Sequence, residues 1–323
     1  MLIYKYSKLF HKYILKLSNC EDDILYTLKG NENIIINKKK HIIHLHIFNI
    51  ELFDDFYAKY YENISDFFTI FITYIIGKKD TLLEELKEKY EKNELYFIHL
   101  LNKGYDVGPK IALINILEKN NINYESILFL HSKTNNEKRH SYFYPLIGTK
   151  EIIKRNINLL ENDNIGGIFP NIYKKEDHDV KKYSLNNLVY FNQIVNYYDL
   201  HEKNIIDFSE GNCLYLHKNV INFIFKNKTK LWYNLCNTID SFDENWIRKR
   251  YNKPDTLSLE DLYNDFTKNS IYFKINNSEI PVGNDLANPS HDMPDGMFEH
   301  VWERLWVNFI YECKMKYFVS NII

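Results

Sequence analysis

The residues IIHLHIFNIELFDDFYAKYYENISDFFTIFITYIIG (42–77) contain two β-branched, largely apolar runs separated by a helical pattern. The runs at 42–48 and 67–76 are typical of buried strands. Between them, the segment 51–64 carries apolar side chains at helical spacing, so one of its faces is expected to pack against the strands. These side chains are Leu52, Phe56, Tyr60 and Ile64. The stretch therefore predicts a strand, a helix and a second strand.

The same alternation continues downstream. The pattern predicts helices at 81–92 and 109–120, which alternate with strands at 95–101 and 126–132. Strands that alternate with helices form a mostly parallel central sheet flanked by helices, so the predicted class is an α/β, Rossmann-like fold. Further on, a helix is expected at 151–165, short strands at 166–170 and 213–218, and a long helix at 297–314. Ligands bind such sheets beyond the carboxyl ends of the strands.

Composition and length favour one domain. The chain has 323 residues, of which 45% are apolar, enough for a sizeable core. No linker rich in Pro, Gly or Ser interrupts it. We therefore expect a single domain over 1–323, with halves at 1–150 and 151–323 and a helical subregion near 220–275.

Charge and cysteine content exclude several classes of protein. The net charge of −2 provides no electrostatic case for a nucleic-acid partner. No run of about 18 uncharged apolar residues occurs, so no integral membrane segment is expected. The four cysteines are widely spaced and include no C-x-x-C pair, which is typical of reduced, cytoplasmic proteins. The abundance of Ile, Asn, Lys and Tyr indicates an AT-rich genome; if that genome is viral, the location would be the host cytoplasm.

Two polar segments follow predicted strands. In NKGYDVGP (102–109), Asn102 and Gly104 permit a tight turn, Asp106 offers a carboxylate, and a helix opens at Pro109 with unpaired N–H groups that suit a nucleotide or its phosphates. The alternative is a plain strand-to-helix turn. In LHSKTNNEKRH (130–140), cationic side chains would neutralise a departing diphosphate, although a solvated loop explains them equally well. They are His131, Lys133, Lys138 and Arg139.

Two later segments also carry candidate residues. In FSEGNCLYLHK (208–218), Gly211 and Asn212 suggest a close backbone approach to a sugar, or simply a bulge or turn. HDMPDGMFEHVWER (291–304) supplies carboxylates in a loop and on the first turns of a helix, where a general base or ordinary helix-dipole complements are the two interpretations. The candidates for the base are Asp295 and Glu303, and His300 and Trp302 are candidates for contact with a sugar acceptor.

A metal site is a weaker interpretation. His44 and His46 face one side of a strand, which is a recognised spacing for metal ligands. With His291 and Asp292 they would indicate a metal-dependent hydrolase. Satisfied structural histidines are the commoner outcome of such a pair.

The ordered set of segments resembles the rhamnan synthesis F family of glycosyltransferases. The segments are HLHIF, ELFDDF, NKGYDVGP, ILFLHSK, IGGIFP, FSEGNCLYL and DGMFEHVWERLW. The resemblance implies a GT-A-like nucleotide-sugar transferase fold and transfer of a deoxyhexose such as rhamnose during polysaccharide assembly. It also implies that 1–150 binds the nucleotide sugar and that 151–323 binds the acceptor and carries the catalytic base.

Residues carry over from this resemblance by motif. His46 closes the first strand, in the wall of the donor site. Asn102, Gly104 and Asp106 match an N-x-G-x-D element, His131 and Lys133 match an H-x-K element, and Glu303 matches the acidic residue of H-x-x-E-R. Two departures stand out. His131-Ser132-Lys133 occupies the place where many GT-A enzymes have a metal-binding Asp-x-Asp, and Asn49-Ile50 replaces the usual Tyr or Pro, which puts the preference for the donor base in doubt.

The resulting hypothesis is an inverting glycosyltransferase that uses a nucleotide-diphosphate sugar and a glycan acceptor. Lys133, Lys138 and Arg139 would stabilise the leaving diphosphate, and Glu303, or failing that Asp295, would deprotonate the acceptor hydroxyl. No cofactor is required, and dependence on a divalent metal is expected to be weak or absent. The alternatives are a non-catalytic glycan-binding or scaffold protein that keeps the fold and, behind it, the metal-dependent hydrolase. The sequence leaves the oligomeric state open.

Overall fold

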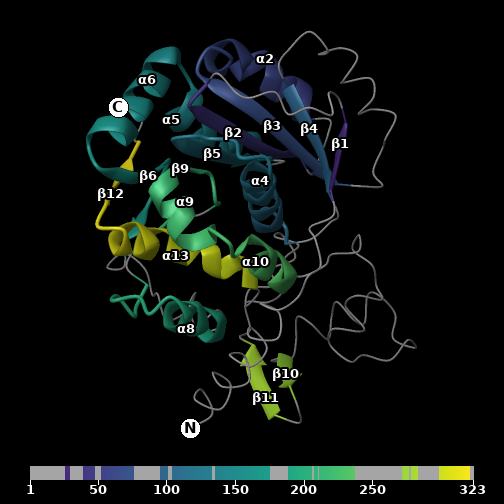
Figure 1. Cartoon of the computed structure of the whole chain (residues 1–323), viewed down its shortest axis with the longest axis vertical. Helices are drawn as coiled ribbons and strands as arrows, with labels where there is room; N and C mark the ends of the chain where they lie inside the picture. The colour runs from purple at the N-terminus through teal and green to yellow at the C-terminus, as the bar shows by residue number, and fades with distance from the viewer. Residues whose placement is uncertain are drawn as a thin grey trace.

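The structure is a computed structural model, and a large central sheet forms its core (Figure 1). It describes residues 26–29, 39–47, 52–75, 95–100, 104–132, 135–174, 188–205, 207–209, 211–236, 271–275, 278–282 and 298–320. The expected helix at 81–92 lies outside the described residues. None of the described helices is both long and apolar enough to cross a bilayer.

The central sheet has eight strands in the order β1-β4-β3-β2-β5-β9-β6-β12. Its strands are β1 (Tyr26–Lys29), β2 (His41–Ile47), β3 (Phe68–Ile75), β4 (Leu95–Leu100), β5 (Ser126–His131), β6 (Ile165–Phe169), β9 (Leu214–His217) and β12 (Lys316–Val319). The expected strands at 42–48, 67–76, 95–101, 126–132, 166–170 and 213–218 are thereby confirmed, with ends that differ by at most one residue.

The sheet is mostly parallel, as the alternating pattern predicted. The four neighbouring strands β4, β3, β2 and β5 are parallel, and β6 pairs in parallel with β12. Strand β9 runs against both of its neighbours, β5 and β6, and β1 runs against β4. Because β9 is reversed, the residues that precede it lie at the edge where the parallel strands end.

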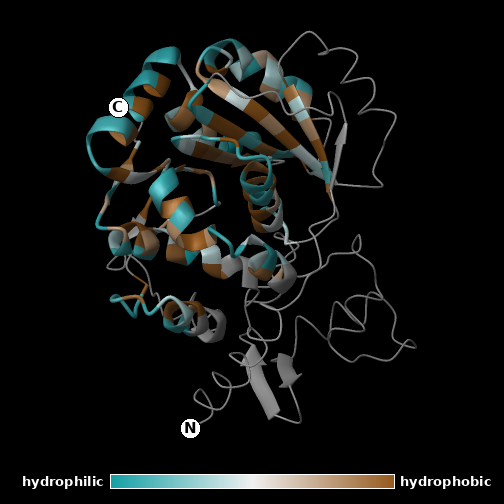
Figure 2. Ribbon diagram, in the orientation of Figure 1, coloured by the Kyte–Doolittle hydropathy of each residue, from teal (hydrophilic) through white to brown (hydrophobic). Residues whose placement is uncertain are grey.

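Helices cover both faces of the sheet (Figure 1). One face packs against α2 (Phe53–Ile64), α5 (Asn136–Ile147) and α6 (Lys150–Asn162), and the other packs against α4 (Val107–Lys119), α9 (Lys218–Phe225), α10 (Thr229–Leu235) and α13 (Phe298–Glu312). Along β2, Ile43 and Leu45 belong to the first layer and Ile42 to the second. Figure 2 shows the apolar strands of the central sheet and the mixture of polar and apolar residues on the helices that cover it. A doubly covered sheet of this kind needs the nearly continuous apolar strands seen in the sequence.

The second half of the chain contains further elements. Helix α8 (Leu188–Tyr197) packs near α13, and β7 (Tyr173–Lys174) pairs with β8 (Asp207–Phe208). Of the helical subregion expected near 220–275, the described parts are α9, α10 and then β10 (Ile271–Ile275), a strand that pairs with β11 (Ser278–Val282). Residues 237–270 of that subregion lie outside the described part of the chain.

Candidate functional site

Several of the candidate residues gather at the carboxyl edge of the parallel strands. His46 lies near the end of β2 and His131 is the last residue of β5. Asp106 follows β4 and precedes α4. Gly211 and Asn212 reach the same edge from the other direction, because β9 begins there. The topology thus brings together residues that are up to 166 positions apart.

The turn into α4 depends on glycine. Gly104 has a φ of +76°, in the region that favours glycine, and its carbonyl accepts bonds from the N–H groups of Val107 and Gly108. A Cβ at Gly104 would lie 2.7 Å from the Cα of Gly108 and 2.8 Å from the Cβ and Sγ of Cys236. The helix begins at Val107, before Pro109, so Asp106 occupies the N-cap position.

An ion pair lies directly below this turn. The Nζ of Lys110 is 2.5 Å from Oδ2 of Asp106 and also donates to the Asp106 carbonyl at 2.9 Å. The side chain of Lys110 is only 2% exposed, whereas that of Asp106 is 18% exposed. Sequence reasoning missed Lys110, because in a lysine-rich chain nothing marked one helical lysine as buried. The sequence did contain a signal for the ion pair, because Asp106 and Lys110 stand at i, i+4 spacing on the helix.

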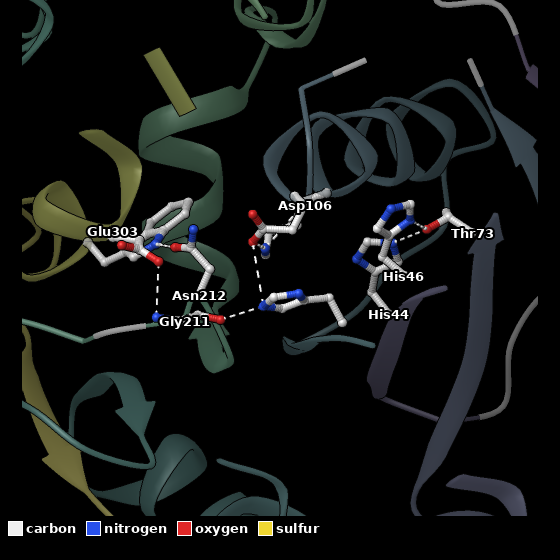
Figure 3. A network of polar contacts seen from close by, with 10 residues as sticks. His44, His46, Thr73, Asp106, Gly211, Asn212 and Glu303 are labelled. Atoms are coloured by element: carbon white, nitrogen blue, oxygen red, sulfur yellow. Dashed lines mark hydrogen bonds and ion pairs between the residues drawn. The ribbon is translucent and has the colours of Figure 1, made fainter. Parts of the chain in front are cut away.

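A chain of hydrogen bonds crosses the edge of the sheet (Figure 3). Nε2 of His131 lies 4.0 Å from Oδ2 of Asp106 and donates to the carbonyl of Gly211 at 2.6 Å. The N–H of Gly211 in turn donates to Oε1 of Glu303, on α13, at 3.0 Å. The Gly211 peptide therefore links the α4 side of the site to a carboxylate on α13.

Helix α13 also forms a hydrogen bond with Asn212, the residue that follows Gly211. The indole Nε1 of Trp306 donates to Oδ1 of Asn212 at 2.8 Å. Gly211 and Asn212 have positive φ values of +90° and +50°, so this turn is tight and left-handed. Glu303 and Trp306 are three residues apart on α13 and share a face, so one helix forms hydrogen bonds with both residues of the turn.

Two buried histidines of β2 lie to one side of Asp106 (Figure 3). Nε2 of His44 and Nδ1 of His46 both bind the hydroxyl of Thr73, at 2.8 and 3.0 Å. One hydroxyl has a single proton, so it donates to one ring and accepts from the other. Burial lowers the pKa of His46 to about 4, against the opposing effect of the Asp106 charge. Burial, with repulsion from His46 and then from Lys110, lowers the pKa of His44 well below its ordinary value. Both rings are neutral at physiological pH.

The histidine pair bears on the metal hypothesis. Its two rings share the Thr73 hydroxyl, as structural histidines do, while Nδ1 of His44 is buried and has no hydrogen-bond partner among the described residues. Among the residues that the structure describes, no group of three or more His, Cys, Asp or Glu side chains is arranged to hold a metal ion. His291 and Asp292, the other members of that hypothesis, lie outside the described residues.

Two expected roles are corrected. Trp302 is completely buried, stacked against Phe225 at 5.5 Å between ring centroids, so it belongs to the core and does not face an acceptor sugar. Arg139 is 6% exposed, and its guanidinium lies 2.5 Å from the carboxylate of Asp55 on α2. This pair sits in the layer of α2 and α5, on the face of the sheet opposite Asp106, so Arg139 is not a cation for a diphosphate bound there.

The remaining candidates are described in part or not at all. Lys138 is exposed in the first turn of α5, where the sequence had suggested a loop. Asn102, Lys133 and Asp295 lie outside the described residues. His300 lies on α13, but the placement of its side chain is not described.

The family comparison covers most of the chain. A model of the family described as rhamnan synthesis protein F matches residues 8–246, which include the sheet strands through β9 and the edge residues from His46 to Asn212. Helix α13, with Glu303, lies beyond the matched range. Searches of curated proteins and of solved structures found no match. Because the family match spans well over half of the sequence, the chain is a member of the rhamnan synthesis protein F family.

Proposed function

We propose that this protein is a glycosyltransferase that moves a sugar, rhamnose or another deoxyhexose, from a nucleotide-diphosphate donor to a glycan acceptor with inversion. Family membership supports a role in rhamnan synthesis. The observation that carries the proposal is the convergence of Asp106, His131, Gly211 and Glu303 at the carboxyl edge of a parallel sheet. That edge is where α/β proteins of this kind bind nucleotides. In this proposal the sheet is GT-A-like.

The reaction is a single displacement. The acceptor hydroxyl oxygen attacks the anomeric carbon of the donor sugar, the bond from that carbon to the diphosphate oxygen breaks, and the hydroxyl proton passes to a carboxylate. We assign this base to Glu303, whose side chain is 19% exposed. Its Oε1 is held by the N–H of Gly211 and its Oε2 lies 3.9 Å from Arg304. Asp295 is the second candidate for the base.

The leaving diphosphate needs positive charge or hydrogen-bond donors. We assign this role to His131 and Lys133, which take the place of a bound divalent ion, with Lys138 nearby in the sequence. The proposed reaction therefore needs no cofactor and depends weakly or not at all on a divalent metal. His300 is the proposed contact for the acceptor. The widely spaced cysteines suit a cytoplasmic location for the reaction.

A binding and transfer screen tests the proposal. Purified protein is melted with a panel of nucleoside diphosphates and nucleotide sugars, with and without divalent cations, and each donor that binds is assayed for release of the nucleoside diphosphate. We expect one class of nucleotide to raise the Tm and its sugar donor to be turned over. Absence of any Tm shift and of any turnover across the panel overturns the proposal.

A matched pair of variants shows whether the described edge is the site. His131→Asn changes the histidine at the carboxyl end of β5, whereas His41→Asn changes a buried histidine at the opposite end of the neighbouring strand β2, where it contacts Ser126 at 2.8 Å. We expect only His131→Asn to weaken nucleotide binding. Equal loss in both variants would indicate a general effect on the fold and would refute the location of the site.

A non-catalytic glycan-binding protein is the second candidate. The observation in its favour is that Glu303 already has a structural partner, because it anchors the Gly211 turn. This candidate predicts glycan binding without a nucleotide and full function in Glu303→Gln. The activities of Glu303→Gln and Glu303→Ala separate this candidate from the transferase.

A further inference from the structure

The feature of interest is the buried charge of Lys110. An ammonium group that is 2% exposed has lost most of its hydration, which costs more than a surface lysine would gain from an ion pair. Apolar residues of similar size often fill such positions with equal or better stability. A buried charge beside the candidate site is therefore a candidate for a functional role.

The ion pair fixes Asp106 at two points. Nζ of Lys110 binds both the carboxylate and the backbone carbonyl of Asp106, so it restrains the side chain and the peptide together. The carboxylate is 18% exposed and faces His131 across 4.0 Å. Lys110 itself is too deeply buried to contact a ligand. Any ligand at this point of the edge therefore meets the carboxylate and not the cation that balances it.

The chemistry of an ionised carboxylate limits what it can bind. A carboxylate only accepts hydrogen bonds, so it repels a diphosphate and attracts hydroxyl groups. A donor nucleotide offers hydroxyls on its ribose and on its transferred sugar, and acidic side chains in related sheets bind ribose hydroxyls in this way. The Lys110 charge balances Asp106 without contacting the ligand.

We propose that Lys110 is a positioning residue that holds Asp106 as an ionised acceptor for carbohydrate hydroxyls of the donor. This inference rests on the proposed function, because it assumes that a nucleotide sugar binds at this edge. In this inference, other residues of the edge bind the diphosphate. Asp106 binds hydroxyl groups of the ribose or of the transferred sugar.

The test is a double-mutant cycle on the whole chain, with dissociation constants measured by calorimetry. The variants are Asp106→Asn, Lys110→Met and the double variant, and the ligand is the nucleoside diphosphate that gives the largest Tm shift. Asparagine keeps an oxygen that accepts a hydrogen bond but loses the charge, so each single variant is expected to lose about 5-fold in affinity for each ligand hydroxyl that Asp106 binds. The double variant is expected to lose no more than Asp106→Asn alone, because Lys110 acts through Asp106.

The pH dependence of ligand affinity distinguishes a positioning role of Lys110 from a purely structural one, which would leave that dependence unchanged. In Lys110→Met the carboxylate of Asp106 lacks its cation, which favours its protonated form, so this variant is expected to lose more affinity than wild type as the pH drops from 8 to 5. His131 faces Asp106 at 4.0 Å in both proteins, so its own response to pH cancels in this comparison. Wild-type protein is expected to show a smaller change, and the double variant, which has no carboxylate at 106, should not gain this dependence. Lys110→Gln provides the same comparison if Lys110→Met does not fold.

A matched control and a set of ligands complete the experiment. Lys59 pairs with Asp55 on α2 at the same i, i+4 spacing, but its side chain is 56% exposed, so Lys59→Met should leave binding unchanged. Ribonucleotides, 2′-deoxyribonucleotides and nucleotide sugars identify which hydroxyls contact Asp106, since only ligands that carry them lose affinity in Asp106→Asn. Inorganic pyrophosphate, which carries no such hydroxyl, should bind Asp106→Asn at least as well as wild type.

The outcomes separate the two proposals. If wild-type protein binds no nucleotide in the panel, the proposed function fails and this inference fails with it. If wild type binds but the losses from Lys110→Met and Asp106→Asn are additive, or neither variant changes affinity, only this inference is overturned.

Discussion

Glu303→Gln separates catalysis from structure at the acidic residue of α13. Glutamine keeps an oxygen that accepts the Gly211 N–H but is not a base, so the turn stays anchored while proton transfer is lost. A hydrogen bond to a charged group contributes about 1.5–3 kcal/mol and one between neutral groups about 0.5–1.5 kcal/mol. The 3.0 Å bond to Gly211 should therefore weaken by about 1 kcal/mol. Loss of a general base lowers kcat by about 100- to 10,000-fold.

The same helix offers a closely matched control. Oε2 of Glu312, also on α13, accepts the backbone N–H of His201 at 3.0 Å, and its side chain is 15% exposed against 19% for Glu303. Glu312→Gln therefore makes the same change to a carboxylate that anchors a backbone N–H, without touching the Gly211 turn. Oε1 of Glu312 also contacts Nδ1 of the exposed His201 ring at 2.8 Å. Both variants should lose similar stability in urea unfolding, and only Glu303→Gln should lose turnover.

The assay is release of nucleoside diphosphate with saturating donor and acceptor, followed over a range of protein concentrations. A kcat for Glu303→Gln within tenfold of wild type would refute the assignment of the base and would favour Asp295 or the non-catalytic candidate. Glu303→Ala adds a second comparison, because it removes the anchor as well. If the alanine variant loses function and the glutamine variant keeps it, Glu303 serves the turn alone.

Three further predictions follow from the geometry and the charges. Folding lowers the pKa of His46 from 6.5 to about 4, so the unfolded chain binds a proton that the folded protein does not. The free energy of unfolding is therefore highest above pH 6.5 and decreases by up to about 3 kcal/mol as the pH falls toward 4. Urea unfolding of His46→Asn should show a flatter pH dependence. Gly104→Ala should lower the free energy of unfolding by at least about 2 kcal/mol, measured in the same way, because of the φ of +76° and the 2.7 Å approach to Gly108. Chelation of divalent ions should leave the rate of sugar transfer within about twofold of its untreated value, whereas a loss of more than tenfold that added metal restores would contradict the metal-free mechanism.

The parallel part of the fold was predictable because it is encoded locally. Residues 42–77 alternate between apolar runs and a helical stripe, and this pattern alone predicts two buried parallel strands and the helix between them. The reversed direction of β9 was not predictable in this way. Its apolar sequence, Leu214–His217, fits either direction, and the choice depends on long-range pairing with β5 and β6. The strand β12 was missed because Lys316–Val319 is short and joins the edge of the sheet only through β6.

Helix α5 includes a polar segment for which the sequence favoured a loop as much as a binding site. Residues 136–140, NEKRH, were interpreted as part of a loop because they carry many polar side chains. In the structure the side chain of Asn135 accepts the N–H of Lys138 and starts a helix there. That helix turns Arg139 toward Asp55, which is 84 residues away in the sequence. Local composition marks a residue as charged but gives no information about its distant partner.

The convergence of Asp106 and His131 at one edge of the sheet was predictable, and the pairings around them were predictable only in part. Asp106 and His131 follow predicted parallel strands, and the rule that such strands end at one edge was enough to bring them together. The roles of Lys110 and Trp302 depend on burial, which comes from the packing of α4 and α13 and has no local signal. Charge pairing follows the same principle: Arg139 and Lys110 are both buried cations, yet one balances an acid on the far face of the sheet and the other balances Asp106.

This difference in pairing shapes the proposed mechanism. A buried cation that already pairs with a carboxylate cannot also hold a diphosphate without giving up that partner, so neither Arg139 nor Lys110 suits the leaving group. What they can do is fix the position of an acid, as Lys110 does for Asp106. Positive charge for the leaving group must then come from groups nearer the solvent. In the proposed mechanism this role falls to His131, 14% exposed at the end of β5, which would exchange its bond to the Gly211 carbonyl for one to the diphosphate, and to Lys133, two positions later.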